Sequence, residues 1–155
     1  MSNVDVQRTN NENESEILNP ADYNKFVRGV DIKAINLKGL VVSDVDSNVG
    51  PDLDVNLRFS CDEYKLDGDT MEAYPVFVLD VSKSINDETH YAFKINAQFV
   101  LIYTIENLED YGQEYFKMFL DRNVPFNVWP YGRELISSLT TKLGLPALFI
   151  DPLKS

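Results

Sequence analysis

The sequence predicts an α+β fold, in which a four-stranded antiparallel sheet, arranged as a meander, is followed by two helices packed on one side. Three observations predict this class. Four segments between residues 30 and 105 alternate apolar and polar side chains, as half-buried strands do. Short, turn-rich links join them, which favours antiparallel neighbours. After residue 105 the apolar residues recur at helical spacing.

The N-terminal segment, residues 1–18, is polar and contains a run of Asn and Glu from Asn10 to Glu16. Such a segment has too little apolar surface to offset the entropy lost on ordering, so we expect a flexible tail. A single domain is expected over residues 19–155. It begins with a short helix at residues 19–29, because Asn19-Pro20 is a favourable cap and first-turn pair and Tyr23, Phe26 and Val27 follow at helical spacing.

The four strands are expected at residues 30–37, 53–61, 74–81 and 91–105. The first changes phase once, between Ile32 and Ile35, which indicates a β-bulge. The second alternates most regularly, and the fourth is the longest. Turns are expected at residues 67–69, between the second and third strands, and at residues 86–88, between the third and fourth.

Two helices should follow the sheet. The first has acidic residues near its start, which favours a helix N-terminus, and its apolar stripe is Leu108, Tyr111, Tyr115, Met118 and Phe119. The second is expected to begin near Pro130 and to end at Gly144, with Leu135, Ile136, Leu139 and Leu143 facing inward.

Composition restricts the function. The net charge of −11 and the pI near 4.4 disfavour nucleic-acid binding and favour basic partners. No apolar run reaches the roughly 20 residues that span a bilayer, so no stable membrane association is expected. The first residues lack the apolar region of a secretory signal, and the single Cys61 cannot form an internal disulfide. We expect a cytoplasmic protein.

No constellation of residues indicates catalysis, a cofactor or a metal. His90 is the only histidine and lies on the polar phase of the fourth strand, whereas Cys61 is in phase with apolar neighbours. Residues 44–48 begin like a calcium loop, but Val49 stands where that loop needs glycine and Val55 where it needs glutamate. The sequence therefore predicts a non-enzymatic binding protein.

One segment carries more information, residues 127–139, which read Asn-Val-Trp-Pro-Tyr-Gly-Arg-Glu-Leu-Ile-Ser-Ser-Leu. Taken alone, Pro130 suits a first helical turn, Glu134 complements the helix dipole, and Arg133 could reach a strand. The segment also resembles the signature of the SecB export-chaperone family, in which an apolar residue precedes Pro-Tyr-Ala-Arg-Glu. Pro130, Tyr131, Arg133 and Glu134 match that signature, while Gly132 replaces the alanine.

The resemblance extends over roughly residues 28–153. Residues 144–152 look like the family's turn and short Leu-rich strand near its Ala-Pro. The printed sequence ends at Ser155, so we expect no counterpart of the family's C-terminal helix.

The resemblance implies a cytoplasmic homotetramer, a dimer of dimers, that holds unfolded or nascent polypeptides without ATP. It places a subunit interface at Phe93, Ile95 and Ala97, for which plain core packing is the alternative. Apolar positions near the helices are candidates for client binding, with core burial again the alternative: Tyr103, Phe116, Phe119, Phe126 and Trp129.

Two positions reverse the charge that export-dedicated family members use to dock the basic tail of the SecA motor. Their first and fourth strands carry acidic docking residues, whereas this chain has Ala34 and Lys38, and Ala92 and Lys94, at the aligned positions. Like charges facing each other are unfavourable, which argues against SecA as a partner. The alternative is a chaperone dedicated to one protein, such as an antitoxin.

Overall fold

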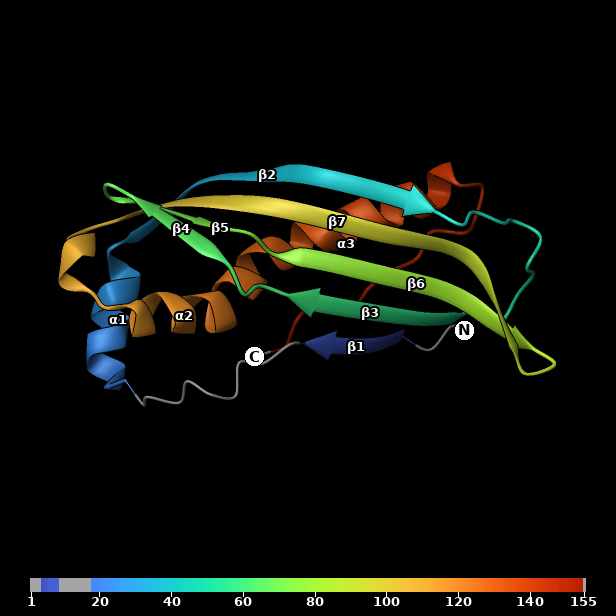
Figure 1. Cartoon of the computed structure of the whole chain (residues 1–155), viewed down its shortest axis with the longest axis horizontal. Helices are drawn as coiled ribbons and strands as arrows, with labels where there is room; N and C mark the ends of the chain where they lie inside the picture. The colour runs from blue at the N-terminus through green and yellow to red at the C-terminus, as the bar shows by residue number, and fades with distance from the viewer. Residues whose placement is uncertain (1–3, 9–17, 155) are drawn as a thin grey trace.

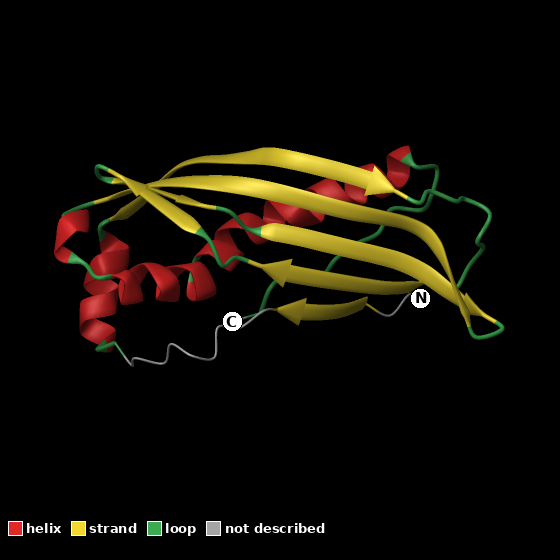
Figure 2. Cartoon of the chain, in the orientation of Figure 1, coloured by secondary structure: helices red, strands yellow, loops and turns green. Residues whose placement is uncertain are grey.

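The computed structural model describes residues 4–8 and 18–154, which form one large sheet with helices on a single face (Figures 1 and 2). In chain order the elements are β1 (Val4–Arg8), α1 (Pro20–Arg28), β2 (Val30–Ser43), β3 (Asp54–Ser60), β4 (Tyr64–Asp67), β5 (Thr70–Ala73), β6 (Val76–Ile85), β7 (Glu88–Ile105), the 3₁₀ turn η1 (Leu108–Asp110), α2 (Gln113–Arg122) and α3 (Val124–Lys142).

Within the described residues the sheet has seven strands, so the prediction of four is wrong in number although the α+β class is confirmed. The central strand is β7, which pairs with β6 and β5 along one side and with β2 along the other, all antiparallel. The path continues from β6 to β3 and from β5 to β4. Because β2 lies beside β7 and not beside β3, the connectivity is that of a Greek key, and the predicted meander is wrong.

Two of the missed strands form a small hairpin, β4–β5, inserted between β3 and β6. The predicted turn at residues 67–69 does exist, but it joins β4 to β5, and Gly68 adopts a positive φ of 61° there. The predicted turn after β6 is confirmed, since Asn86 and Asp87 both have a positive φ between β6 and β7. Two such residues in succession match the tight turn that suits the twist of a hairpin.

The third missed strand, β1, lies within the segment for which the sequence predicts a flexible tail. Val4–Arg8 pair with residues 55–59 of β3 in a parallel register at the edge of the sheet (Figure 1). Residues 1–3 and 9–17, which the same prediction covers, lie outside the described residues.

The edge strand β2 is longer than predicted and contains two irregularities. Its register against β7 shifts between Ile32 and Ala34, as the change of phase indicated, and again between Leu37 and Gly39. The extra residues at these shifts are Lys33 and Lys38. Bulges and charged residues are common on edge strands, where they hinder pairing with another sheet.

The helices differ from the predictions at their boundaries. Helix α1 is as expected, with the Asn19 side chain accepting a hydrogen bond from the Ala21 amide (2.8 Å). Helix α3 begins at Val124, because Pro125 occupies the first turn that we assigned to Pro130. Pro130 lies inside the helix, where it has no N–H to donate. The helix ends at Lys142, with Leu143 as its C-cap residue, and Gly144 follows at φ 79°.

The core lies between the sheet and the helices. Helix α3 crosses the helix-covered face of the sheet, and its Trp129 ring contacts Phe59 of β3 and Phe77 of β6. At one end of the sheet, Phe26 of α1 packs against the ring of Tyr23 on the same helix and against four rings that follow β7, those of Tyr111, Tyr115, Phe116 and Phe119. The chain after α3 contains no strand over residues 144–152, which corrects the expectation of a Leu-rich strand there, yet Ile150 is buried in the same core.

Candidate functional site

The signature segment of α3 holds the chain that follows the helix. Trp129 is buried between Phe59 of β3 and Phe77 of β6, with ring centroids 5.6 and 5.5 Å away. Its indole Nε1–H donates a 2.8 Å hydrogen bond to the carbonyl of Asp151. The apolar part of the ring thus fills the core while its polar edge binds the returning backbone.

Arg133 makes the second of these contacts. Its Nε–H donates a 2.6 Å hydrogen bond to the carbonyl of Ile150, one turn of helix after Trp129. Further along α3, the hydroxyl of Thr140 accepts from the Leu148 amide (3.0 Å), and the Thr140 carbonyl accepts from the Leu145 amide. The segment 145–151 is therefore fastened along α3 by side chains of the helix. The sequence predicts that Arg133 could reach a strand, whereas the Arg133 side chain binds this segment, which contains no strand.

The packing around Gly132 explains why glycine stands where the signature has alanine. An ideal Cβ at this position would have its three nearest neighbours in the Phe77 ring, all under 3.0 Å away. The ring of Phe77 also contacts Phe59, Phe99 and Trp129. Gly132 lets α3 approach β6 closely enough for this aromatic cluster to form.

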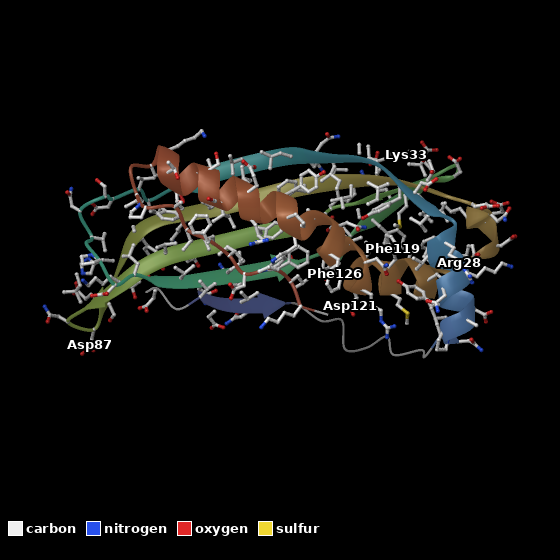
Figure 3. All side chains as sticks on the ribbon, turned by 180° about the vertical axis from the view of Figure 1, so that it is seen from behind. Arg28, Lys33, Asp87, Phe119, Asp121 and Phe126 are labelled. Atoms are coloured by element: carbon white, nitrogen blue, oxygen red, sulfur yellow. The ribbon has the colours of Figure 1, made fainter. Side chains whose placement is uncertain are left out.

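The five side chains predicted to bind clients do not lie together on a surface. Tyr103, Phe116, Phe119 and Trp129 are each at most 3% exposed, whereas Phe126 is 42% exposed. Figure 3 shows the helix-covered face, with Phe119 on α2 and Phe126 near the start of α3. In this chain on its own, only Phe126 of the five offers apolar surface to another molecule.

The three residues predicted at the subunit interface, Phe93, Ile95 and Ala97, lie on the helix-facing side of β7. All three are buried, at 1–2% exposure. Within the single chain they pack in the core, and contact with a second copy stays a prediction.

Exposed apolar side chains occur in two places relevant to binding. On α3, Phe126 and Tyr131 are 42% and 49% exposed, and Pro130 between them is exposed too. We call these three residues the α3 outer stripe. Phe126 and Pro130 are four residues apart and share a helix face, and Tyr131 follows Pro130 directly. On β2, four side chains are exposed that we call the β2 apolar edge: Ile32, Leu37, Leu40 and Val41.

Sequence reasoning missed most of these positions. The sequence predicts a structural role for Tyr131 in the signature, and the first predicted strand, residues 30–37, includes Ile32 and Leu37 but not Leu40 and Val41. The clue for β2 was the pair of lysines that interrupt its apolar alternation, Lys33 and Lys38, because charged interruptions are typical of edge strands.

The two candidate reactive residues have different surroundings. His90 is exposed, with Nε2 3.9 Å from a carboxylate oxygen of Glu88. Cys61 is half-buried, and burial, with a smaller contribution from the charge of Asp62, raises the pKa of its thiol to about 12. A thiol with such a raised pKa is a poor nucleophile at neutral pH, because the thiolate is the reactive form.

The charge-reversed positions lie on β2 and β7. Lys38 Nζ is 4.4 Å from the centroid of the Tyr74 ring, and Lys94 Nζ is 3.9 Å from that of Tyr91. Lys94 is also 3.6 Å from a carboxylate oxygen of Asp44. Both ammonium groups therefore rest on aromatic faces, which is a favourable cation–π arrangement.

Comparison with known proteins gives a consistent result. A family model described as preprotein translocase subunit SecB matches residues 24–154. Two curated proteins named protein-export protein SecB, from Wolbachia sp. subsp. Drosophila simulans (strain wRi) and from Wolbachia pipientis wMel, are each 30% identical over 78 residues. The match covers 48% of this chain and 47% of each relative, so the chain spans about half the length of the curated relatives it matches.

Among solved structures, a Mycobacterium tuberculosis SecB-like chaperone in complex with a ChAD peptide from the HigA1 antitoxin has a similar fold. The TM-score is 0.70 at 19% identity, covering 83% of this chain and 94% of that chain. Within residues 4–8 and 18–154, no helix has the length and apolar character needed to cross a membrane.

Proposed function

Because this chain belongs to the SecB family, we propose that it is an ATP-independent chaperone that holds unfolded or nascent polypeptides in the cytoplasm. The observation that carries the proposal is the α3 outer stripe, where Phe126, Pro130 and Tyr131 are exposed on the helix that also carries the buried Trp129. Exposed aromatic surface of this kind commonly marks a site of interaction with other polypeptides. The net charge of −11 would add attraction for basic segments of a client.

We further propose that the chain works as a homotetramer and not as an enzyme. The β2 apolar edge supports assembly, since an exposed edge strand with unpaired backbone groups can pair with another copy. Tyr103, Phe116, Phe119 and Trp129 would contact a client only after the helices move off the sheet. Phe126 and Tyr131 need no such movement.

A second candidate is a chaperone dedicated to one protein, such as an antitoxin, without SecA. Two observations favour it. The similar fold of the M. tuberculosis protein was solved with a peptide from an antitoxin. Lys38 and Lys94 also place positive charge where SecA docking would need negative charge, and their contacts with tyrosine rings hold that charge in place.

The direct test measures how the chain suppresses aggregation of a chemically denatured client at near-equal subunit ratio. We expect suppression by the natural chain and loss of most of it in Phe126→Ser/Tyr131→Ser. Thr141→Ala/Lys142→Ala, which changes two exposed residues of the same helix, is the matched control and should suppress aggregation fully. A natural chain that leaves aggregation unchanged would exclude the holdase.

Pull-down from the native host separates the two candidates. A spread of unfolded clients supports the general holdase, whereas one stoichiometric partner supports the dedicated chaperone.

A further inference from the structure

The first strand, β1, covers the outer edge of β3 and contributes little to the core. Val4, Asp5, Val6 and Gln7 are all exposed, Val4 by 36% and Val6 by 40%. Their partners on β3 are different, because Val55 and Leu57 are buried at 3% and 0%. The core thus ends at β3, and β1 is an addition to its edge.

The pairing is parallel and follows the phase of β3. Directly paired residues place their side chains on the same face of a sheet, so Val4 and Val6 lie on the helix-covered face beside Val55 and Leu57. Asp5 lies beside Asn56 on the open face. The edge of β3 therefore accepts an extended segment in which small apolar residues alternate with polar ones.

The pairing of β1 with β3 is weak by comparison with the pairing of the other strands. Parallel pairing is slightly less stable per residue than antiparallel pairing, and β1 is only five residues long. Every other strand pair formed by residues 4–8 and 18–154 is antiparallel. The described part of β1 has no side chain within the hydrophobic core, which includes Val55, Leu57 and Phe59 of β3.

From these observations we propose that β1 occupies a binding site for a client strand at the edge of β3. An extended client segment with alternating apolar residues displaces β1 from this edge. The inference rests on the proposed function and adds a second binding element to the α3 outer stripe. Recognition by strand addition depends mainly on backbone hydrogen bonds, which every polypeptide can supply. Such an edge suits a protein that binds unfolded segments of many sequences.

Displacement has a thermodynamic consequence. While β1 occupies the edge, only the fraction of molecules with β1 detached can bind there, and the apparent affinity falls by that fraction. Weakening β1 should therefore raise the affinity for an extended peptide. It should leave the fold intact, because the core does not include β1.

The experiment uses the whole chain and two variants. In Asp5→Pro/Val6→Pro, two successive residues lose their N–H groups. Successive N–H groups of a strand point to opposite sides, so one of the two removed donors is the one that faces β3. The matched control, Asp5→Ala/Val6→Ala, keeps both donors. The probe is a fluorescent peptide with the sequence of residues 2–9, and a scrambled peptide with its two valines adjacent serves as the negative control.

We expect the proline variant to bind the probe about tenfold more tightly than the natural chain does, and the alanine variant to differ little. The scrambled peptide should bind weakly to all three proteins. Hydrogen exchange gives an independent readout. Amides of residues 4–8 should lose protection when a denatured client is added to the natural chain, while amides of residues 54–60 stay protected.

Three results would overturn the inference. The first is equal probe affinity for the natural chain and a proline variant whose near-UV circular dichroism shows an intact core. The second is continued protection of residues 4–8 in a client complex, which would leave the proposed function standing and remove only the displacement. The third is dimerisation of the proline variant alone, which would make the edge an interface between copies. If aggregation assays show no client binding, the proposed function fails. The peptide measurement then still shows whether an extended peptide can displace β1 from the edge of β3.

Discussion

Gly132 shows at the scale of single residues how one atom decides the packing of α3. Its missing Cβ is replaced by the ring of Phe77, which belongs to a cluster with Phe59, Phe99 and Trp129. Glycine inside a helix ordinarily costs about 0.5–1 kcal/mol relative to alanine. Here close aromatic packing offsets that cost, and the family's alanine would not fit against this ring.

The substitution Gly132→Ala should accordingly destabilise the chain, by about 1–3 kcal/mol, because the Phe77 ring must move. Phe77→Leu combined with Gly132→Ala should recover part of the loss, since leucine leaves space for the methyl group. The measurement is the free energy of unfolding in urea for the two single variants and the double variant.

The control is Gly39→Ala on β2, where the nearest atom to an added Cβ is 3.9 Å away, at Gln98. This variant should be close to neutral. If Gly132→Ala were as stable as the natural chain, the close approach of α3 to β6 would be refuted.

Cys61 leads to a prediction on pH. Burial raises the pKa of its thiol from 9.0 to about 12 in the folded chain, so the unfolded chain releases this proton first as pH rises. The stability that the neutral thiol contributes is fully present below about pH 9 and is lost as pH rises through 12. Between pH 8 and 10 the natural chain should therefore lose more stability than Cys61→Ala, which has the same tyrosines and shares any contribution from their titration.

Unfolding in urea at three pH values within that range checks the difference. Equal pH dependence in the two proteins would mean that the thiol is as accessible to water in the folded state as in the unfolded one. Slow labelling of the native thiol at pH 8.5, and fast labelling in urea, is expected from the same burial.

At the scale of elements, α3 and the segment after it act as one unit. Trp129 and Arg133 bind the carbonyls of Asp151 and Ile150, and Thr140 binds the Leu148 amide. The matched signature residues thus include one that fixes the returning backbone, Arg133, and one that is exposed, Tyr131. The signature combines a structural role with part of a candidate surface.

The substitution Trp129→Phe tests the fastening of this segment. Phenylalanine keeps an aromatic ring in the core but removes the N–H donor, which should cost about 1 kcal/mol. Because the lost bond holds residue 151, we expect faster proteolysis after Lys154 or Lys142 in the variant. Tyr131→Phe, at an exposed position of the same helix, is the control and should be cut at the natural rate.

Sequence reasoning was most successful where one physical signal dominates. The clean alternation around Leu57 and along β7, and the Asn19 cap of α1, identified elements that the structure confirms. It failed for β1 and for the β4–β5 hairpin, which are short and gain their order from pairing with neighbouring strands. Pro130 misplaced the start of α3, since the β-branched and aromatic residues before it favour extended structure as strongly as helix.

The candidate site was harder to predict for a related reason. An aromatic side chain at helical spacing can face the core or the solvent, and the sequence does not separate the two. Phe116 and Phe119 are buried while Phe126 is exposed, because the chain turns from α2 into α3 at Asn123 and changes the face that meets the sheet.

At the scale of the whole molecule, the helices among the described residues cover one face of the sheet and leave the other face and the edges exposed. The β2 apolar edge lies at one side of the sheet, and Leu66 of β4, 42% exposed, lies at the end of the path on the other side. Bulges at Lys33 and Lys38 interrupt β2 without removing its exposed apolar residues. Assembly through β2 would cover these residues.

If copies assemble through β2, Leu40→Lys should lower the mass in solution, because a charge at the edge opposes strand pairing and desolvation. Light scattering coupled to size exclusion measures that mass. Leu66→Lys is the matched control on β4 and should leave the mass unchanged. A drop in mass for Leu66→Lys alone would place the contact at the opposite edge.

The central position of β7 also determines when the other strands can pair during synthesis on the ribosome. Both β2 and β5 pair with β7, whose last residue is Ile105, so neither can join the sheet until two thirds of the polypeptide has been made. Until then β2, which carries the exposed Ile32, Leu37 and Leu40, stays unpaired. Unpaired apolar strands are the segments most prone to aggregation during synthesis. Slowing translation before residue 105 should therefore reduce the yield of folded protein more than slowing it afterwards.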